Sequence, residues 1–465
     1  MKKIFFLGLT FVLLFSCKPY DNGELIGVKT IPWSEPNPHG MVLIPKGNFE
    51  LGQAEEDSIF ALNTPSKFVS VSSFWMDENE ITNGQYKQFI KWVCDSIIRE
   101  KMADPAYGGN DEYKITEDAK GEPITPRLNW KVPLPDPKRA SEEELTALNY
   151  FKEKDEVFGG YRINTDKVLY RYEWYDYASA AKRANELNAL KRNRNTDLNG
   201  APIATVMITK DTAYYTEKGV VVNTSITRPL SSRMDFMHTR IIAIYPDTTC
   251  WVNDFTNSYN EPYLRNYFSH PAYNAHPVVG VSWEQAVAFC NWRTNYLNAS
   301  LRKNGQKAME YRLPTEAEWE FAARGKQKAN KYPWKSNKTD TEKGCYYANF
   351  KPTKGGYTND GHITTAKVAS YPANSYGLYD MAGNVAEWTS TTWSESGYSD
   401  MSDLNPSLQT NAASNDAYIN KRKVVRGGSW KDAARFIEVS HRSFEFQNET
   451  RAFIGFRCVR SQIGE

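Results

Sequence analysis

The chain has 465 residues, of which 40% are hydrophobic and 14% aromatic, with 57 Lys and Arg side chains against 55 Asp and Glu. This composition is typical of a globular protein that is long enough to bury a large core. The near balance of charge argues against a nucleic-acid-binding protein, because binding to a phosphate backbone relies on clustered cations.

The N-terminal segment has the pattern of a lipoprotein signal peptide covering residues 1–16. Two lysines precede an apolar run, Ile4–Phe15, that is too short to span a bilayer. The run ends in Leu14-Phe15-Ser16-Cys17, which resembles a lipobox, so we expect acylation of Cys17 after cleavage. Lys18 in place of Asp favours the outer membrane, with the body of the protein on its periplasmic face. An ordinary secretory signal with a chance cysteine is the alternative.

Residues 17–39 are polar and contain prolines, which is typical of a tether between a lipid anchor and a folded domain. We expect that domain to cover residues 40–465. It opens with two strand patterns, Gly47–Gly52 and Phe68–Met76. Three helices are predicted by capping boxes, in which a hydroxyl side chain stands three residues before Glu or Gln. These boxes begin at Thr82, Ser282 and Thr315.

The middle of the chain, from about residue 102 to residue 269, combines a proline-rich piece with weaker patterns. We predict a helix over Leu169–Leu190 and two strands, Thr205–Thr209 and Gly219–Asn223. Further on, Tyr332–Asp360 is expected to be irregular and held by aromatic side chains. Such backbone needs additional ties, because no ladder satisfies its polar groups.

Several motifs resemble those of the formylglycine-generating enzyme (sulfatase-modifying factor) family. The resemblance implies an α+β fold related to C-type lectins, with little regular secondary structure. Residues 102–269 do not fit that core, so we interpret them as a large insertion that makes contacts with other proteins. The motifs are Met41-Val42-Leu43-Ile44-Pro45, Glu80-Ile81-Thr82-Asn83, Pro277–Trp283, Tyr311–Glu320, Gly377–Trp388 and Arg426-Gly427-Gly428-Ser429-Trp430.

The family's copper chemistry is not expected here. In the family, the Gly-Gly-Ser-Trp turn is followed by two copper-binding cysteines, and the matching positions of this chain hold Asp432 and Ile437. Cu(I) needs soft thiolate sulfur, whereas Ile437 has no lone pair and Asp432 offers a hard oxygen. The six histidines show no metal-binding spacing that could replace the thiols. We therefore predict that the protein is not an enzyme and binds no copper.

The resemblance also implies two Ca²⁺ sites built from hard oxygen donors. The alternative is that the same carboxylates and amides cap turns without a metal ion. For the first site the matching donors are the Asn349 side chain, the Phe350 carbonyl, Asp360 and the His362 carbonyl. For the second they are Asp380, the Gly383 carbonyl, the Val385 carbonyl and Glu387.

Cys290 and Cys458 match positions that form a structural disulfide in the family. The compartment expected from the leader permits such a bond. Two buried free thiols are the alternative.

A narrower resemblance is carried by Tyr245–Thr249, Asn260–Tyr263 and Tyr267–Tyr273, together with the lipobox. These segments resemble the PorK/GldK lipoproteins of the type IX secretion and gliding motility machinery; the related lipoprotein GldJ shares the fold. The resemblance implies a non-catalytic structural lipoprotein in a periplasmic ring, which assembles with itself and with a PorN/GldN-like partner. A lectin-like or peptide-binding surface module and a formylglycine-generating oxidase are the alternatives.

Overall fold

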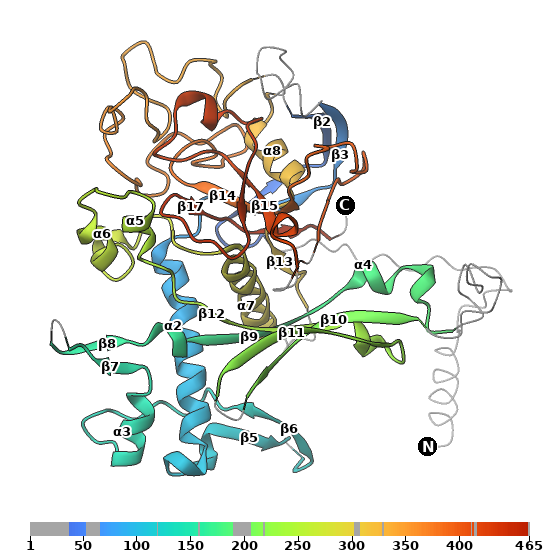
Figure 1. Cartoon of the computed structure of the whole chain (residues 1–465), viewed down its shortest axis with the longest axis vertical. Coiled ribbons are helices and arrows are strands. Elements are labelled where there is room, and N and C mark those ends of the chain that lie inside the picture. The colour runs from blue at the N-terminus through green and yellow to red at the C-terminus, as the bar shows by residue number, and fades with distance from the viewer. Residues whose placement is uncertain are drawn as a thin grey trace, which may run out of the picture. The chain divides into compact units, whose positions relative to one another are not determined.

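Two four-stranded sheets and three longer helices form the centre of the computed structural model of the chain (Figure 1). The structure describes residues 37–52, 66–118, 120–156, 159–188, 206–216, 219–301, 307–327, 330–410, 412 and 416–463. The leader, Cys17 and all but the last residues of the tether lie outside these ranges, so those predictions stay predictions.

The mixture of short strands and few helices agrees with the expected α+β class. The helices are α2 (Asn83–Met102), α3 (Glu142–Leu148), α4 (Tyr177–Ala180), α5 (Cys250–Asn253), α6 (Glu261–Asn266), α7 (Trp283–Leu301) and α8 (Glu316–Arg324). The strands are β1 (Met41–Ile44), β2 (Gly47–Leu51), β3 (Lys67–Val71), β4 (Phe74–Asp77), β5 (Lys114–Glu117), β6 (Pro123–Leu128), β7 (Lys152–Lys154), β8 (Tyr161–Ile163), β9 (Leu169–Tyr175), β10 (Met207–Tyr215), β11 (Val221–Pro229), β12 (Met237–Ala243), β13 (Tyr311–Arg312), β14 (Ala386–Thr392), β15 (Arg422–Arg426), β16 (Ser443–Phe446), β17 (Ile454–Gly455) and β18 (Val459–Ser461).

The two central sheets join distant parts of the sequence. One sheet has the order β1-β4-β18-β13, so strands from both ends of the domain lie side by side. The other has the order β16-β15-β14-β17, and β15 leads directly into the Gly-Gly-Ser-Trp turn. The sheets therefore fix the position of that turn.

The three predicted capping boxes are confirmed. At the start of α2 and α8, the hydroxyl groups of Thr82 and Thr315 accept from the third backbone N–H of the helix. Ser282 does the same before α7, with a distance of 3.2 Å to the Gln285 nitrogen. Helices α2 and α7 then meet through stacked aromatic rings, with the centroids of Tyr86 and Phe289 5.6 Å apart.

The predicted helix over Leu169–Leu190 is wrong. Its first part is strand β9, in which Tyr170 and Tyr172 are buried whereas Arg171 is exposed, an alternation of period two that belongs to a strand. The two predicted strands overlap the longer strands β10 and β11, which form one hairpin, although Thr205 lies outside the described residues and residues 219–220 precede β11. In Figure 1 the first elements of the predicted insertion, α3 and β5 to β8, lie beside the lower part of α2.

The irregular segment Tyr332–Asp360 contains no helix or strand among its described residues, as predicted. Stacked rings hold it, because the Trp334 ring lies 4.8 Å from Tyr332 and 5.3 Å from Tyr347 between centroids. In the described part of the chain, no helix is both long enough and apolar enough to cross a membrane.

Candidate functional site

The Gly-Gly-Ser-Trp turn is tightly packed, and its glycines are structurally required. Gly427 and Gly428 have φ values of +89° and +64°, a backbone conformation that residues other than glycine rarely adopt. A Cβ atom on Gly428 would lie 2.5 Å from the Phe436 carbonyl oxygen and 2.8 Å from Cγ2 of Ile437. The turn thus presses against the segment that carries the second copper position.

Asp432, at the first copper position, acts as a cap of this turn. Its Oδ2 atom accepts from the Ser429 backbone nitrogen at 2.9 Å and from the Ser429 hydroxyl at 2.6 Å. Lys431 Nζ lies 2.9 Å from the other carboxylate oxygen. The carboxylate is therefore occupied by the protein's own donors, in the manner typical of a turn-capping Asp.

Ile437, at the second copper position, is fully buried. It belongs to an apolar cluster with Tyr332, Ala348, Phe350 and Ala382, which includes part of the irregular segment. An alkyl side chain in such surroundings offers no metal ligand. In the described part of the chain, no group of three or more His, Cys, Asp or Glu side chains is placed to hold a metal ion.

His441 and Arg442 follow the turn but do not form a replacement catalytic set. Burial, together with the nearby Arg426 charge, lowers the pKa of His441 to about 4, so this imidazole is neutral at pH 7. Arg442 donates through Nη2 to Glu316 at 2.9 Å. Its guanidinium is thus committed to an internal ion pair.

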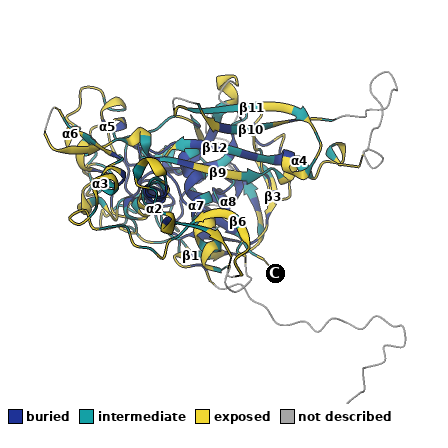
Figure 2. Cartoon of the chain, turned by 90° about the horizontal axis from the view of Figure 1, so that it is seen from below, coloured by how far each residue is buried: buried dark blue, intermediate teal, exposed yellow. Residues whose placement is uncertain are grey.

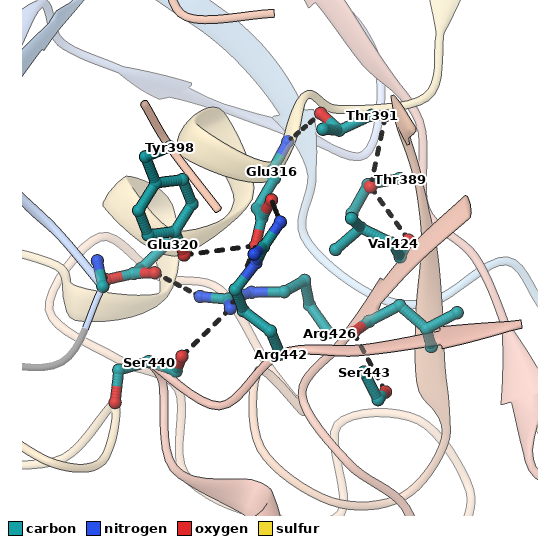
Figure 3. A network of polar contacts seen from close by, with 12 residues as sticks. Glu316, Glu320, Thr389, Thr391, Tyr398, Val424, Arg426, Ser440, Arg442 and Ser443 are labelled. Carbon is teal, nitrogen blue, oxygen red and sulfur yellow. Dashed lines mark hydrogen bonds and ion pairs between the residues drawn. The ribbon is translucent and has the colours of Figure 1, made fainter. Parts of the chain in front are cut away.

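A buried ion network surrounds Arg426, the residue that directly precedes the turn (Figure 3). Arg426, the last residue of β15, lies between Glu316 and Glu320, which project from successive turns of α8, and it pairs with both. Arg442 also pairs with Glu316, and Arg324 with Glu320, at 2.7 Å. Glu316, Glu320 and Arg426 belong to the family motifs, whereas Arg324 and Arg442 lie outside them, and the pairing of these residues was not predicted. The signal was present as charged residues within otherwise apolar motifs.

The four positions of the first implied calcium site come together in one loop region. Asp360 accepts from the Phe350 nitrogen at 2.6 Å and from the His362 nitrogen at 3.1 Å. Asn349 is buried and donates to the Thr364 carbonyl at 2.9 Å. Burial raises the pKa of Asp360 above its ordinary range, although hydrogen bonds from the His362 and Phe350 backbone oppose the rise. The donors are hard oxygens of the type that calcium takes.

The second implied site surrounds a strained loop. Asp380 and Gly383 both have positive φ, +55° and +76°, and a Cβ on Gly383 would lie 2.2 Å from the Asn349 carbonyl oxygen. Asp380 accepts from the Ala369 nitrogen at 2.8 Å. One carboxylate oxygen of Glu387 accepts a hydrogen bond from Arg457 Nη2 at 2.7 Å, and the other accepts one from the Trp319 indole N–H at 2.8 Å.

A third buried carboxylate, which the sequence analysis did not assign, belongs to this loop. Glu80 accepts from the Asn384 amide at 2.6 Å and from the Val385 nitrogen at 3.1 Å. Burial first, then Asp380 and Glu387, raise the pKa of Glu80 well above its ordinary range. Burial raises the pKa of Asp380 to about 6.

The charge of this loop fits a cation, but the ligand role of Glu387 fits less well. Three buried carboxyl groups share one guanidinium, so ionisation of all three would require a further cation, such as a divalent ion. Both oxygens of Glu387, however, already accept hydrogen bonds, which leaves few lone pairs for a metal. The remaining candidate ligands of this site are Asp380 and the Gly383 and Val385 carbonyl oxygens. Both calcium sites stay predictions.

The two cysteines of the expected disulfide lie next to each other. Cys290 is on α7, Cys458 directly precedes β18, and their sulfur atoms are 3.5 Å apart. Both are buried, and the structure holds them as free thiols. The structure thus brings the predicted pair together, and the disulfide itself stays a prediction.

The sequence matches a known protein family over most of its length. A family model described as a sulfatase-modifying factor enzyme 1-like domain matches residues 29–133 and 169–462, well over half of the chain. The chain belongs to the FGE-sulfatase family. The predictions of family and α+β fold are therefore confirmed. The family model skips residues 134–168 and matches the rest of the predicted insertion, residues 102–133 and 169–269, so the bounds of the insertion stay a prediction.

The family's curated relatives include both active and inactive proteins. The formylglycine-generating enzyme of Mus musculus is 35% identical over 194 residues, covering 40% of this chain and 45% of that protein. The inactive C-alpha-formylglycine-generating enzyme 2 of the same species is 37% identical over 191 residues, covering 40% and 49%. The chain thus spans about half the length of these relatives. Among solved structures, PvdO from Pseudomonas aeruginosa superposes with a TM-score of 0.43 and 16% identity, covering 90% of this chain and 94% of that one.

Proposed function

We propose that this FGE-sulfatase protein is a non-catalytic structural lipoprotein, anchored in the outer membrane through Cys17. In this proposal it forms part of a periplasmic ring of the type IX secretion and gliding machinery, together with a PorN/GldN-like partner. The observation that carries the non-catalytic part is the filling of both copper positions. Ile437 is fully buried among apolar side chains, and Asp432 is bonded to Ser429.

A structural role is supported by the kind of change seen at these positions. A scaffold needs the turn and its supporting network, which are intact, but does not need the thiols. The family contains a relative named as inactive, so loss of the chemistry with retention of the fold has a precedent. The insertion supplies exposed apolar side chains suited to protein contacts, such as Tyr161, Tyr214 and Tyr215.

The non-catalytic part is tested by incubating the full-length chain with Cu(I) and a cysteine-containing sulfatase peptide. Mass spectrometry of the peptide should show no conversion of cysteine to formylglycine, whereas the enzyme of Streptomyces coelicolor in parallel should convert it. Turnover by this chain, with copper bound in stoichiometric amount, would contradict the proposal.

The anchor is tested by membrane fractionation. Cys17→Ala should move the protein from the membrane fraction to the soluble periplasmic fraction, because a lipid chain supplies about 0.8 kcal/mol per buried methylene. Cys345→Ala is the matched control, since Cys345 is an exposed cysteine of the folded body and should leave fractionation unchanged. Membrane retention of the Cys17 variant would remove the anchor from the proposal.

The scaffold part is tested by removing one piece of the insertion. The ends of the β7–β8 hairpin are adjacent, because the Asn164 nitrogen donates to the Phe151 carbonyl at 2.7 Å, so a short glycine linker can replace the hairpin. We expect the shortened protein to fold but to lose the large complex that copurifies with the full-length chain from detergent-extracted membranes. Electron microscopy of that complex should show rings. A full-length chain that purifies only as a monomer would contradict the ring.

A further inference from the structure

The hairpin β10–β11 is a two-stranded sheet that packs on the neighbouring sheet β12–β9, and the Asn223 side chain of β11 bonds to the Ile241 backbone of β12. Strand β12 pairs with β9, and β10 packs beside β12, where the Asp211 nitrogen donates to Nδ1 of His238 at 3.0 Å. Figure 2 shows the strands in the order β11, β10, β12, β9, with β11 outermost and coloured as exposed or intermediate. Among the described residues, the edge of β11 that faces away from β10 pairs with no other strand.

The hydrogen bonds at both ends of the hairpin show which backbone groups point outward. The Thr216 nitrogen donates to the Val220 carbonyl at 2.9 Å, and the Leu230 nitrogen donates to the Val206 carbonyl at 2.8 Å. The backbone N–H and C=O groups of the even-numbered residues of β11 therefore point toward β10, because hydrogen-bonded and non-bonded pairs alternate in an antiparallel ladder. The outward backbone groups belong to Val221, Asn223, Ser225 and Thr227, and no described residue forms a backbone hydrogen bond with them.

This edge lacks the protection that the other hairpins of the insertion have. Natural edge strands are kept from pairing by charge, proline or short length. Strand β6 contains two prolines, and β7 is three residues long with the sequence Lys-Glu-Lys. Strand β11 is nine residues long, and residues 221–227 contain neither charge nor proline. Such a strand is suited to pairing with another strand.

We propose that β11 pairs antiparallel with β11 of a second copy of this chain, about a two-fold axis at Thr224. In that register Asn223 faces Ser225 of the second copy, and Val221 faces Thr227. Outward backbone groups therefore meet outward backbone groups along the whole contact, as an antiparallel ladder requires.

The side chains of this register match as well. Val222 would lie opposite Ile226 and Thr224 opposite itself, which gives pairs of β-branched residues that favour strands. No two like charges are opposed, since Arg228 faces Val220 and is already paired with Asp235 in its own chain. The uncharged residues 221–227 of β11 are thus complementary to themselves. The contact goes beyond the proposed function, because it depends on neither the lipid anchor nor another protein.

A single strand pair buries less than the roughly 800 Å² per partner of a stable interface, so we expect weak association that is best trapped covalently. Thr224→Cys, in the Cys345→Ser background to remove the exposed native thiol, places two cysteines across the axis. They form a non-bonded antiparallel pair with Cα atoms about 4.5 Å apart, within the range of a disulfide. Mild oxidation of the full-length protein in detergent should give a covalent dimer.

Thr227→Cys in the same background is the matched control, because the two introduced cysteines would lie about 20 Å apart in this register. We expect at least about tenfold less covalent dimer for this control than for Thr224→Cys. Equal yields for the two variants, or a folded Thr224→Cys protein that stays monomeric, would overturn the proposal.

A second pair of variants tests the edge without a disulfide at the axis. Ile226→Lys, at a side chain that is 38% exposed, adds a charge to the proposed contact and should lower the cross-linking of Thr224→Cys about tenfold. Met207→Lys, at a 55% exposed position on β10, adds the same charge outside the contact and should leave the yield unchanged. Loss of cross-linking with both lysines, or with neither, would contradict pairing through β11.

Discussion

The Gly-Gly-Ser-Trp turn and the neighbouring loop of residues 380–385, here called the Asn384 loop, are in direct contact but differ in which polar side chains they keep. The Gly383 nitrogen donates to the Gly427 carbonyl at 3.0 Å, and the Trp430 nitrogen donates to the Asn384 carbonyl at 2.9 Å. On the turn, both copper positions hold side chains that cannot bind a soft metal. In the loop, three carboxylates remain buried with a single guanidinium.

This difference indicates that the groups which hold the fold together are separable from those which performed its chemistry. Buried charges of the loop and the network each contact several segments of the chain, so loss of one leaves its partners unpaired in a low-dielectric interior. A copper thiolate contacts only the metal, and an apolar residue can replace it without leaving an unpaired charge. The following predictions test this separation.

The largest effect is expected from Arg426→Met. The change leaves Glu316 and Glu320 without the guanidinium that lies between them, and unpaired buried charges typically cost about 3–5 kcal/mol. Urea unfolding followed by tryptophan fluorescence measures the free energy of unfolding. Arg171→Met is the control, because the Arg171–Glu173 pair is exposed and should contribute less than about 1 kcal/mol. Equal losses for the two variants would mean that the network does not support the turn.

Acid should destabilise the protein through His441. Its pKa is about 4 in the folded chain and about 6.5 when exposed, so below pH 6.5 the unfolded chain binds a proton that the folded chain does not. Stability therefore falls as the pH drops from about 6.5 to about 4, by up to about 3 kcal/mol. The groups that face this imidazole are Arg426, Arg435 and Asp432.

His441→Phe should remove this share of the pH dependence, as measured by melting temperature between pH 7.5 and pH 4.5. The ring of Phe436 already packs against His441 with centroids 5.1 Å apart, so a phenyl group is compatible with the site. An unchanged slope in the variant would show that His441 is solvated in the folded state.

Much of the fold could be predicted from the sequence because its signals are local. The capping boxes at Thr82 and Thr315 depend on residues three positions apart, and they mark the starts of α2 and α8. The predicted helix after Leu169 is wrong because the aromatic residues there recur with a period of two, which belongs to a strand. Tyr170 packs against Phe89 of α2, with ring centroids 5.1 Å apart, and its hydroxyl donates to Asn291 of α7, contacts that favour the strand.

The site was predicted in part, for a related reason. Asp432 and Ile437 could be located by their distance from the turn, but the partners of Asp432 lie in the geometry of that turn. The pairing of Arg426 with Glu320 joins residues 106 positions apart, and no local pattern carries that information. The role of Glu80 was missed for the same reason, since it bonds to Asn384, 304 positions away.

Removal of calcium should lower the stability of the protein through its two predicted calcium-binding loops. If the Asn384 loop or the loop of residues 349–362 binds Ca²⁺, free calcium at about 100 times its dissociation constant adds about 2.7 kcal/mol per site to the free energy of unfolding. Excess EGTA should then lower the melting temperature of the full-length protein. Asp380→Ala should abolish part of that shift, whereas Asp403→Ala, at an exposed position, should not. An unchanged melting curve in EGTA, with no calcium found by elemental analysis, would mean that these carboxylates only cap turns.

The smallest effect is expected from the turn itself. Asp432→Ala removes the acceptor of two hydrogen bonds from Ser429, and a lost cap of this kind costs about 1 kcal/mol. Asp432→Asn retains an acceptor oxygen and should cost less, since the amide can still receive the Ser429 nitrogen. If the carboxylate were instead part of a working metal or catalytic site, Asp432→Ala would leave stability unchanged or raise it, because removal of a functional charge relieves strain. A loss of about 1 kcal/mol in urea unfolding, partly restored by Asp432→Asn, therefore places Asp432 with the groups that hold the fold.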